Sequence, residues 1–151
     1  MKPDRLIRIV YVSRAVAGWD MRRNGGAEGI EGILATSRRN NSRAGLTGAL
    51  IYNREVFGQV IEGPERAVED TVLRIETDPR HHDMRVLDLR SIAAPAFADW
   101  SMGFVGPRES MGGGAAEDRR TTYDLLAMGG DAVFATLHRI AMGEDAFLRV
   151  L

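Results

Sequence analysis

The chain has 151 residues, a formal net charge of −1 and no cysteine. Its length suits one domain with a short extension, and its balanced charge argues against binding to nucleic acid or an anionic membrane, because both need a sustained basic face. The lack of cysteine excludes disulfides, thiolate metal sites and cysteine nucleophiles, and the absence of a signal-like start or a long apolar stretch predicts a cytoplasmic protein.

The first third of the chain predicts a strand, a loop and a helix. Residues 6–13 are rich in β-branched side chains and alternate in character, which is typical of a strand. Residues 17–26 are polar and rich in glycine, and these features indicate a loop. From residue 27 onward apolar side chains recur at helical spacing, and the Asn-Asn-Ser cluster at residues 40–42 predicts the end of the helix.

The middle of the chain predicts a hairpin and a second helix. Residues 46–52 and 56–62 have the composition of two strands, and the three residues between them suit a tight turn. We therefore expect these strands to pair antiparallel. Pro64 suits the first position of a helix, which we expect to end near Asp78.

Two further strand patterns complete the predicted sheet. They cover residues 85–92 and 100–105, and in the second pattern Trp100, Met102 and Phe104 alternate onto one face. The order β-α-β-β-α-β with one extra strand predicts an α+β, ferredoxin-like fold. Right-handed crossovers place both helices on one face of its sheet, and the first and third strands become central neighbours.

A change of composition predicts a boundary that separates a domain at residues 1–106 from a helical extension at residues 107–151. A glycine run at residues 111–114 is typical of a flexible joint. Two C-terminal helices are predicted, one at residues 115–128 and one that begins after Asp131 as its cap. Their apolar stripes must cover either the open face of the sheet or a partner.

Gln59 is unusual within its strand, because the alternation predicts an apolar side chain on the face that it shares with Phe57. A buried amide costs roughly 1–3 kcal/mol unless its donor and acceptor find partners. The predicted topology puts Tyr11 on the adjacent strand, and Asn40 and Asn41 face the same layer. Four polar side chains gathered at one internal position indicate a binding site more than mutual pairing.

Other kinds of catalytic or metal site have little support. The three histidines are not placed as in a hydrolytic triad, and no glycine motif for phosphate occurs next to a predicted strand and helix. Asp78, His81, His82 and Asp83 carry groups that can bind metals, but a short polar turn after a helix is more often simply solvated. We therefore expect no metal site.

Several motifs in order resemble the BLUF family, the blue-light sensors that use a flavin. The similarity covers roughly residues 5–106. It is carried by Val10-Tyr11-Val12-Ser13, Arg39-Asn40-Asn41, Leu46-Thr47-Gly48, Phe57-Gly58-Gln59-Val60-Ile61-Glu62-Gly63, Asp78-Pro79-Arg80-His81-His82 and Phe97-Ala98-Asp99-Trp100-Ser101-Met102. The resemblance implies a flavin, FAD or alternatively FMN, held between the two helices. Gly58 departs from the pattern, in which a bulkier apolar residue commonly precedes the glutamine.

The resemblance also implies roles for the polar cluster. Tyr11 would give an electron to the excited flavin, and Gln59 would lie between the Tyr11 hydroxyl and the flavin edge with N5 and the C4 carbonyl. Rotation or tautomerisation of the Gln59 amide would then change the hydrogen bonds and leave the flavin chemically restored. Trp100 and Met102 match positions that compete for the space beside the glutamine and pass the signal to the sheet.

The cofactor-binding residues that we predict are Ser37, Asn40, Asn41, Phe57, Gln59, Arg74 and Asp78. The resemblance implies a photoreceptor without enzymatic activity, which signals to a downstream protein partner or within a homo-oligomer through its C-terminal helices. The residues alone leave two alternatives open. One is a ferredoxin-like enzyme of the acylphosphatase type, in which Arg and Asn grip a phosphate, and the other is a dimerisation module without a cofactor.

Overall fold

The computed structural model describes residues 4–17, 19, 30–53, 55–98, 100–105 and 125–142. Within these ranges the chain forms five strands and three helices. In chain order they are β1 (Leu6–Ala15), α1 (Ile30–Ala44), β2 (Thr47–Asn53), β3 (Val56–Pro64), α2 (Glu65–Glu76), β4 (His81–Ser91), β5 (Gly103–Val105) and α4 (Gly130–Met142). The order of elements through β5 is the predicted one.

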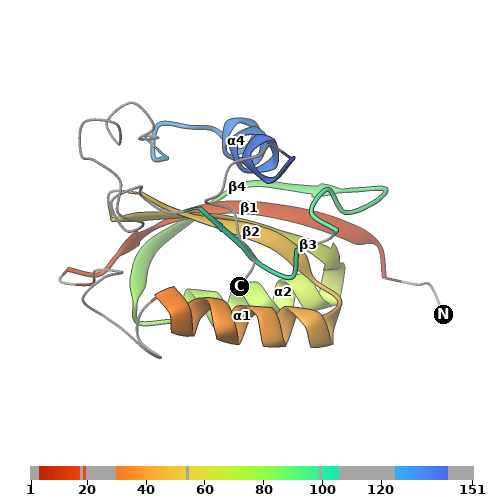
Figure 1. The fold of residues 1–151 in the computed structure, drawn as a ribbon, viewed down its shortest axis with the longest axis horizontal. Helices are drawn as coiled ribbons and strands as arrows, with labels where there is room; N and C mark the ends of the chain where they lie inside the picture. Colours follow the sequence, from red (N-terminus) through yellow and green to blue (C-terminus); the bar gives the residue numbers. More distant parts are fainter. Residues whose placement is uncertain are drawn as a thin grey trace.

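The strands form one sheet in the order β4-β1-β3-β2-β5. The first four strands pair antiparallel, whereas β5 runs parallel to β2. Helices α1 and α2 cover one face of the sheet, and α4 lies over the other face (Figure 1). The predicted α+β, ferredoxin-like arrangement is confirmed, with β1 and β3 as central neighbours, because each crossover helix connects two strands that flank a third.

The predicted C-terminal elements are described only in part. The expected loop at residues 17–26 and the expected helix at residues 115–128 lie largely outside the described residues. The described part of that helix, residues 125–128, is not helical, and residues 125–127 form a turn. The second predicted C-terminal helix corresponds to α4, which begins one residue before the expected cap Asp131. Among the described residues, no helix is both long enough and apolar enough to span a membrane.

Strand β5 is shorter than predicted, and this changes the position of Trp100. Only Gly103–Val105 pair with β2. Trp100 packs against the core on the α4 side of the sheet, whereas Met102 belongs to the core on the α1 side. The expectation that Trp100 and Met102 share one face is therefore wrong, because the chain bends between them and the two-residue alternation of a strand does not apply.

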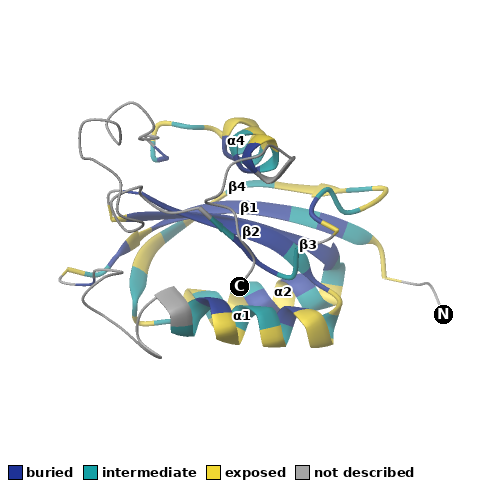
Figure 2. Cartoon of the chain, viewed as in Figure 1, coloured by how far each residue is buried: buried dark blue, intermediate teal, exposed yellow. Residues whose placement is uncertain are grey.

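Strand β3 separates the two halves of the core and is buried on both of its faces (Figure 2). Phe57 and Ile61 belong to the cores beneath α1 and α2, whereas Val60 belongs to the core beneath α4. The alternation of strand side chains explains this division, because odd-numbered positions point to one face and even-numbered positions to the other. Gln59 therefore faces α1 and α2, while Gly58 and its neighbours of even number face α4.

Candidate functional site

A cavity of about 270 Å³ lies between the sheet and the helices α1 and α2. This volume is close to the lower end of the range of about 300–1,000 Å³ that is usual for small-molecule pockets. Strands β1, β2 and β3 form its floor with Tyr11, Ser13, Leu50, Phe57 and Gln59. All five side chains are buried, so the floor is held in place by the packed sheet.

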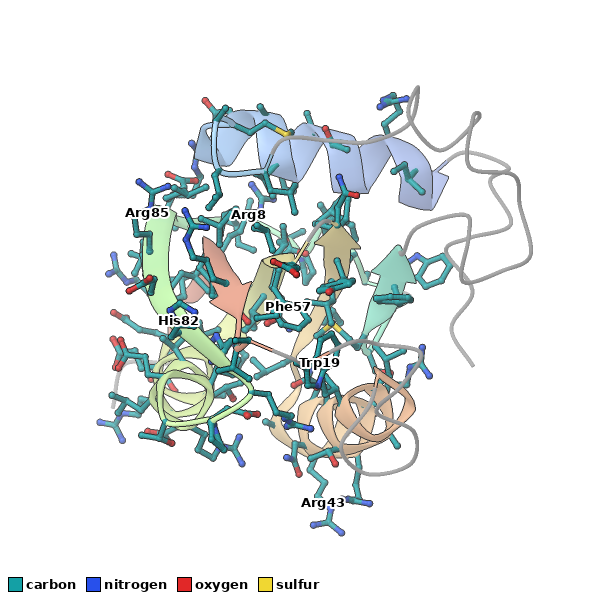
Figure 3. All side chains as sticks on the ribbon, turned by 90° about the vertical axis from the view of Figure 1, so that its left-hand side faces the viewer. Arg8, Trp19, Arg43, Phe57, His82 and Arg85 are labelled. Carbon is teal, nitrogen blue, oxygen red and sulfur yellow. The ribbon has the colours of Figure 1, made fainter. Side chains whose placement is uncertain are left out.

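An aromatic cluster supports the floor on the α1 side. The rings of Trp19, Tyr52 and Phe57 lie between 5.0 and 5.2 Å apart, in tilted or edge-to-face orientations. Such pairs contribute about 0.5–1.5 kcal/mol each beyond the burial of their surface. Figure 3 shows Trp19 over α1 with Phe57 nearby, and this cluster fixes the Phe57 ring beside the cavity.

Helix α1 supplies one wall of the cavity through residues that share one helical face. Ile33, Ser37, Asn40 and Asn41 line it, at the spacing of three and four residues that keeps side chains on one side of a helix. Asn41 is only 2% exposed, and its Nδ2 donates a hydrogen bond of 2.7 Å to the Ser101 carbonyl. A primary amide has two N–H donors and one acceptor, so Asn41 can hold this carbonyl and also contact a ligand.

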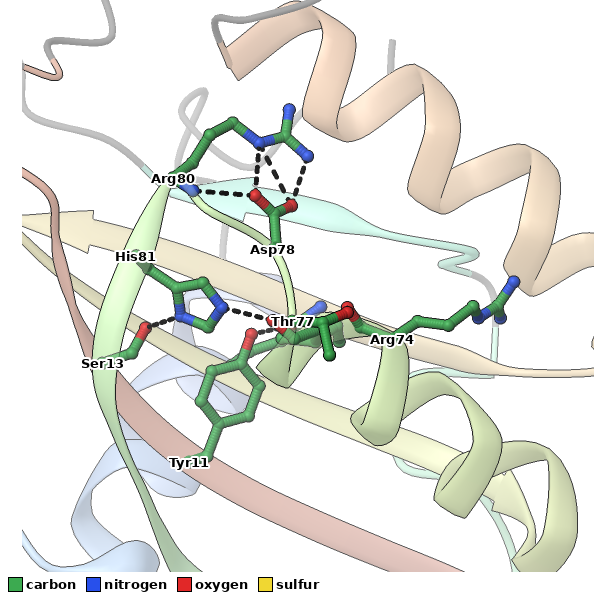
Figure 4. A network of polar contacts seen from close by, with 9 residues as sticks. Tyr11, Ser13, Arg74, Thr77, Asp78, Arg80 and His81 are labelled. Carbon is green, nitrogen blue, oxygen red and sulfur yellow. Dashed lines mark hydrogen bonds and ion pairs between the residues drawn. The ribbon is translucent and has the colours of Figure 1, made fainter.

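Helix α2 and the turn after it supply the opposite wall with Thr71, Arg74, Asp78 and Arg80. Arg74 donates a hydrogen bond of 3.1 Å to the Thr71 hydroxyl. The Arg80 guanidinium contacts both carboxylate oxygens of Asp78, and the Arg80 backbone N–H donates to Oδ1 at 2.9 Å (Figure 4). Burial alone would raise the pKa of Asp78, but these bonds and charges hold it below its ordinary value.

His81 joins the second helix to the floor of the cavity. One ring nitrogen, Nε2, lies against the carbonyl oxygen of Ile75, and the other, Nδ1, lies 2.8 Å from the Ser13 hydroxyl (Figure 4). A carbonyl oxygen only accepts, so Nε2 must carry the proton. In the neutral ring Nδ1 then accepts the hydrogen bond from Ser13. This arrangement holds β1, α2 and the first residue of β4 together at one end of the cavity.

Tyr11 and Gln59 lie directly opposite each other on β1 and β3, and both are almost fully buried. The Tyr11 hydroxyl donates a hydrogen bond to Oε1 of Gln59. Burial raises the pKa of Tyr11 above its ordinary value, and the negative charge of Asp78 raises it further. Tyr11 is therefore a neutral donor at pH 7, and its bond determines which end of the Gln59 amide faces it.

The other end of the Gln59 amide contacts Met102. Nε2 of Gln59 lies 3.5 Å from Sδ of Met102, which is 1% exposed. Nε of Arg38 donates to the Met102 carbonyl at 3.0 Å, and burial lowers the pKa of Arg38. Met102 therefore occupies the space beside the glutamine, while Trp100 packs on the opposite side of the sheet.

The structure brings most of the predicted site residues together. Ser37, Asn40, Asn41, Phe57, Gln59, Arg74 and Asp78 all line the cavity, and so does Tyr11. Trp100 and Met102 do not line it.

Ser13 and His81 were missed as pocket residues by the sequence reasoning. The alternation of β1 could have identified Ser13, because it shares a face with Tyr11, whereas the direction of the His81 ring depends on the turn after α2. Within the described ranges, no group of three or more His, Asp or Glu side chains is arranged to hold a metal ion.

Comparison with known proteins identifies a family model that covers this site. The model for "Sensors of blue-light using FAD" (BLUF) matches residues 6–103. Photoactivated adenylate cyclase subunit beta of Euglena longa is 34% identical over 74 residues, which are 48% of this chain and 9% of that protein. The blue light- and temperature-regulated antirepressor BluF of Escherichia coli K12 is 36% identical over 67 residues, which are 44% of this chain and 16% of that protein.

Solved structures extend the similarity to almost the whole chain. The dark-state structure of the BLUF protein BlrB has a TM-score of 0.71 and 35% identity, and the match covers 93% of this chain and 98% of that one. The ground state of BlsA has a TM-score of 0.74 over 97% of this chain and 94% of that one, and its 23% identity supports the fold alone. The chain spans about a tenth of the length of the first curated relatives that it matches.

Proposed function

The chain belongs to the BLUF family, the sensors of blue light using FAD, and from this premise we propose that the cavity between α1 and α2 holds the flavin and that Gln59 is the switch. Members of this family are flavin-binding blue-light sensors, and this chain is one of them. The observation that carries the assignment is the buried hydrogen bond from Tyr11 to Gln59 at the floor of the cavity. Nε2 of this buried amide meets the Met102 sulfur, which is a weak acceptor, so a polar ligand edge in the cavity would give the amide a stronger partner.

The side chains around the cavity suit the ring system of a flavin. Ile33, Leu50, Phe57 and Ile75 offer apolar surface for the faces of a planar ring. Amide groups of Asn40, Asn41 and Gln59, with the Ser37 hydroxyl, offer donors and acceptors for a ring edge that carries carbonyls and N–H groups. The cation of Arg74 lines the same space and is placed to balance an anionic group outside the ring, whereas Arg80 already pairs with Asp78. The donor set therefore fits the cofactor of the family.

The bound flavin supplies an excited state that accepts an electron under blue light. Tyr11 is the proposed donor, because its hydroxyl lies in the cavity and can release its proton along the hydrogen bond to Gln59. A carboxamide can respond by exchanging its donor and acceptor ends, since one end carries N–H groups and the other an oxygen. After this exchange, the groups that face Tyr11 and Met102 have opposite hydrogen-bonding character.

Met102 is the protein residue that we propose responds to this exchange of the Gln59 amide ends. It contacts Nε2 of Gln59, and a thioether accepts only weak hydrogen bonds. An amide oxygen at this place would repel the sulfur and find no donor there, so exchange of the two ends would displace Met102. Trp100, two residues earlier and half-buried on the other side of the sheet, is the side chain available to take part in that displacement.

The identity of the flavin and the output of the sensor are further parts of the proposal. FAD is favoured over FMN by the description of the family model. We assign the flavin site to residues 1–106 and the output to residues 107–151, which act on a separate protein partner or a second copy of the chain. The chain itself has no proposed catalytic activity. The acylphosphatase alternative needs an exposed Arg-Asn loop, whereas Asn41 is buried in α1.

Absorption spectroscopy tests this function directly. The purified chain, loaded with FAD, is expected to show flavin bands that move reversibly to longer wavelength in blue light and return in the dark. Release of the cofactor by heat and its chromatography against FAD and FMN standards identifies the preferred flavin. A protein that binds no flavin, or whose flavin spectrum does not move in blue light, refutes the proposal.

A further inference from the structure

The carboxylate of Glu62 is completely buried on the α4 side of β3, the face opposite the cavity. Oε1 accepts a hydrogen bond of 2.9 Å from the Phe97 backbone N–H. Oε2 accepts one of 3.1 Å from the Ala96 backbone N–H and one of 2.9 Å from Nε of Arg8. Three charge-assisted hydrogen bonds thus hold a carboxylate that has no contact with solvent, which makes it a strong anchor for the chain at residues 96 and 97.

The segment of backbone that Glu62 anchors also reaches the proposed flavin pocket. We call the described residues 96–98 and 100–102 the crossing segment, because Phe97 belongs to the core beneath α4 and Met102 belongs to the core beneath α1. At its far end, Sδ of Met102 contacts Nε2 of Gln59 and the Ser101 carbonyl accepts from Asn41. The crossing segment therefore touches two pocket residues at one end and Glu62 at the other.

Helix α4 packs on the anchored end of the crossing segment through aromatic rings. The Phe97 ring lies edge to face against Phe134 at 5.8 Å and against His138 at 5.7 Å. The rings of Phe134 and His138 stack on each other at 5.5 Å. The Arg8 guanidinium, which binds Glu62, lies 3.9 Å from the centre of the Phe134 ring. Glu62 is therefore linked to α4 through two intermediate residues, because Phe97 and Arg8 each bind its carboxylate and each contact Phe134.

We propose that Glu62 is a positioning residue that couples the contact between Gln59 and Met102 to helix α4. This inference rests on the proposed function, because it takes the movement of Met102 as its input. With residues 96 and 97 held by the carboxylate, a displacement at Met102 is passed to Phe97 and to α4. Without that anchor, the irregular backbone of the crossing segment absorbs the displacement. A purely structural Glu62 would stabilise the turn and leave the coupling unchanged.

The substitution Glu62→Gln separates these two roles in the 151-residue, FAD-loaded chain. It keeps the size of the side chain but removes the charge, and its amide N–H groups cannot accept from Ala96 or Arg8. The measurements are the absorbance shift in blue light and the hydrogen exchange of the α4 amides, each compared between darkness and continuous light. Glu65→Gln is the matched control, since Glu65 makes the same kind of pair, with Arg5, across a similar sequence separation and at an exposed position.

Glu62→Gln is expected to keep the absorbance shift while the light-minus-dark difference at α4 falls by about fivefold or more, the lower end of usual coupling factors. Glu65→Gln is expected to keep both signals. If Glu62→Gln keeps the full difference at α4, the inference is overturned, whatever its effect on melting temperature. Absence of any absorbance shift in the unmodified chain refutes the proposed function instead.

A second variant keeps the test decisive if Glu62→Gln does not fold or does not bind flavin. Phe134→Leu removes the ring that contacts Phe97 and Arg8 and leaves the carboxylate and its hydrogen bonds in place. It is expected to keep the absorbance shift and to lose most of the light-minus-dark difference at α4. A difference at α4 that survives in Phe134→Leu contradicts the route through these rings.

Discussion

Replacement of Gln59 by leucine tests the central element of the proposed switch. Leucine is close to glutamine in size but has neither donor nor acceptor, so the Tyr11 hydroxyl loses its partner in a place where it is 4% exposed. The net loss of one such hydrogen bond is about 1 kcal/mol, and an unpaired buried hydroxyl costs about 1–3 kcal/mol. New apolar contact with Met102 offsets part of this cost.

We therefore expect Gln59→Leu to lower the free energy of unfolding by about 1–2 kcal/mol, which is about 2–8 °C in melting temperature for a chain of this size. The variant should still bind flavin, because the walls of the cavity are unchanged, and it should show no absorbance shift in blue light. Ile61→Leu is the matched control, because this buried residue lies on the same face of β3 two positions along. The control is expected to keep the shift.

A double-mutant cycle with Tyr11→Phe checks the origin of the stability loss. Tyr11→Phe should also abolish the normal photocycle. In the double variant no hydroxyl is left unpaired, so its stability should be no lower than that of Gln59→Leu alone. Additive costs of the two substitutions would show that the Tyr11–Gln59 bond is not what Gln59→Leu breaks, and a normal light-induced shift in Gln59→Leu would refute the role assigned to Gln59.

Three further predictions follow from other parts of the structure. Gly58→Val should loosen the packing of α4, because even a Cβ at this position would lie 3.0 Å from Ile51 and 3.6 Å from Val133. Hydrogen exchange of the α4 amides in darkness should then be faster than in the unmodified chain. The pKa of Asp78 is lowered in the folded protein, so its ionised carboxylate stabilises the fold above the unfolded pKa near 4. This stabilisation is lost as the pH falls through the folded pKa. The melting temperatures of the unmodified chain and of Asp78→Asn should therefore converge in acid. The pKa of Tyr11 is raised in the folded protein, so the stabilisation by its neutral hydroxyl is complete below about pH 10 and declines at higher pH. Tyr11→Phe should therefore lose less stability in alkali than the unmodified chain does.

Much of the fold could be predicted because its patterns are local. The alternation in β1 and β3 and the helical spacing before residue 40 each appear within a few residues of sequence, and right-handed crossovers then leave few topologies. The same alternation identified Gln59 as a polar residue at a buried position. The predicted topology put the strands of Tyr11 and Gln59 side by side, and in the structure the two residues are direct partners in the register.

The other features of the site could not be predicted, because they depend on turns and bends that have no repeating pattern of apolar residues. Trp100 and Met102 were expected on one face, but the bend before β5 sends them to opposite sides of the sheet. The position of His81 depends on the turn after α2. The burial of Glu62 depends on N–H groups contributed by residues 34 and 35 positions further along the chain, a distance that no local pattern covers.

The contrast between β3 and β5 has a mechanical consequence. β3 is paired on both edges and buried on both faces, whereas β5 is a three-residue strand at the margin of the sheet, with a partner on one side among the described strands. A central strand of this kind is stiff, and a short marginal one is compliant. Under the proposed switch, a change at Gln59 would therefore move Met102, which lies just before this margin, more readily than it would move the neighbouring residues of β3.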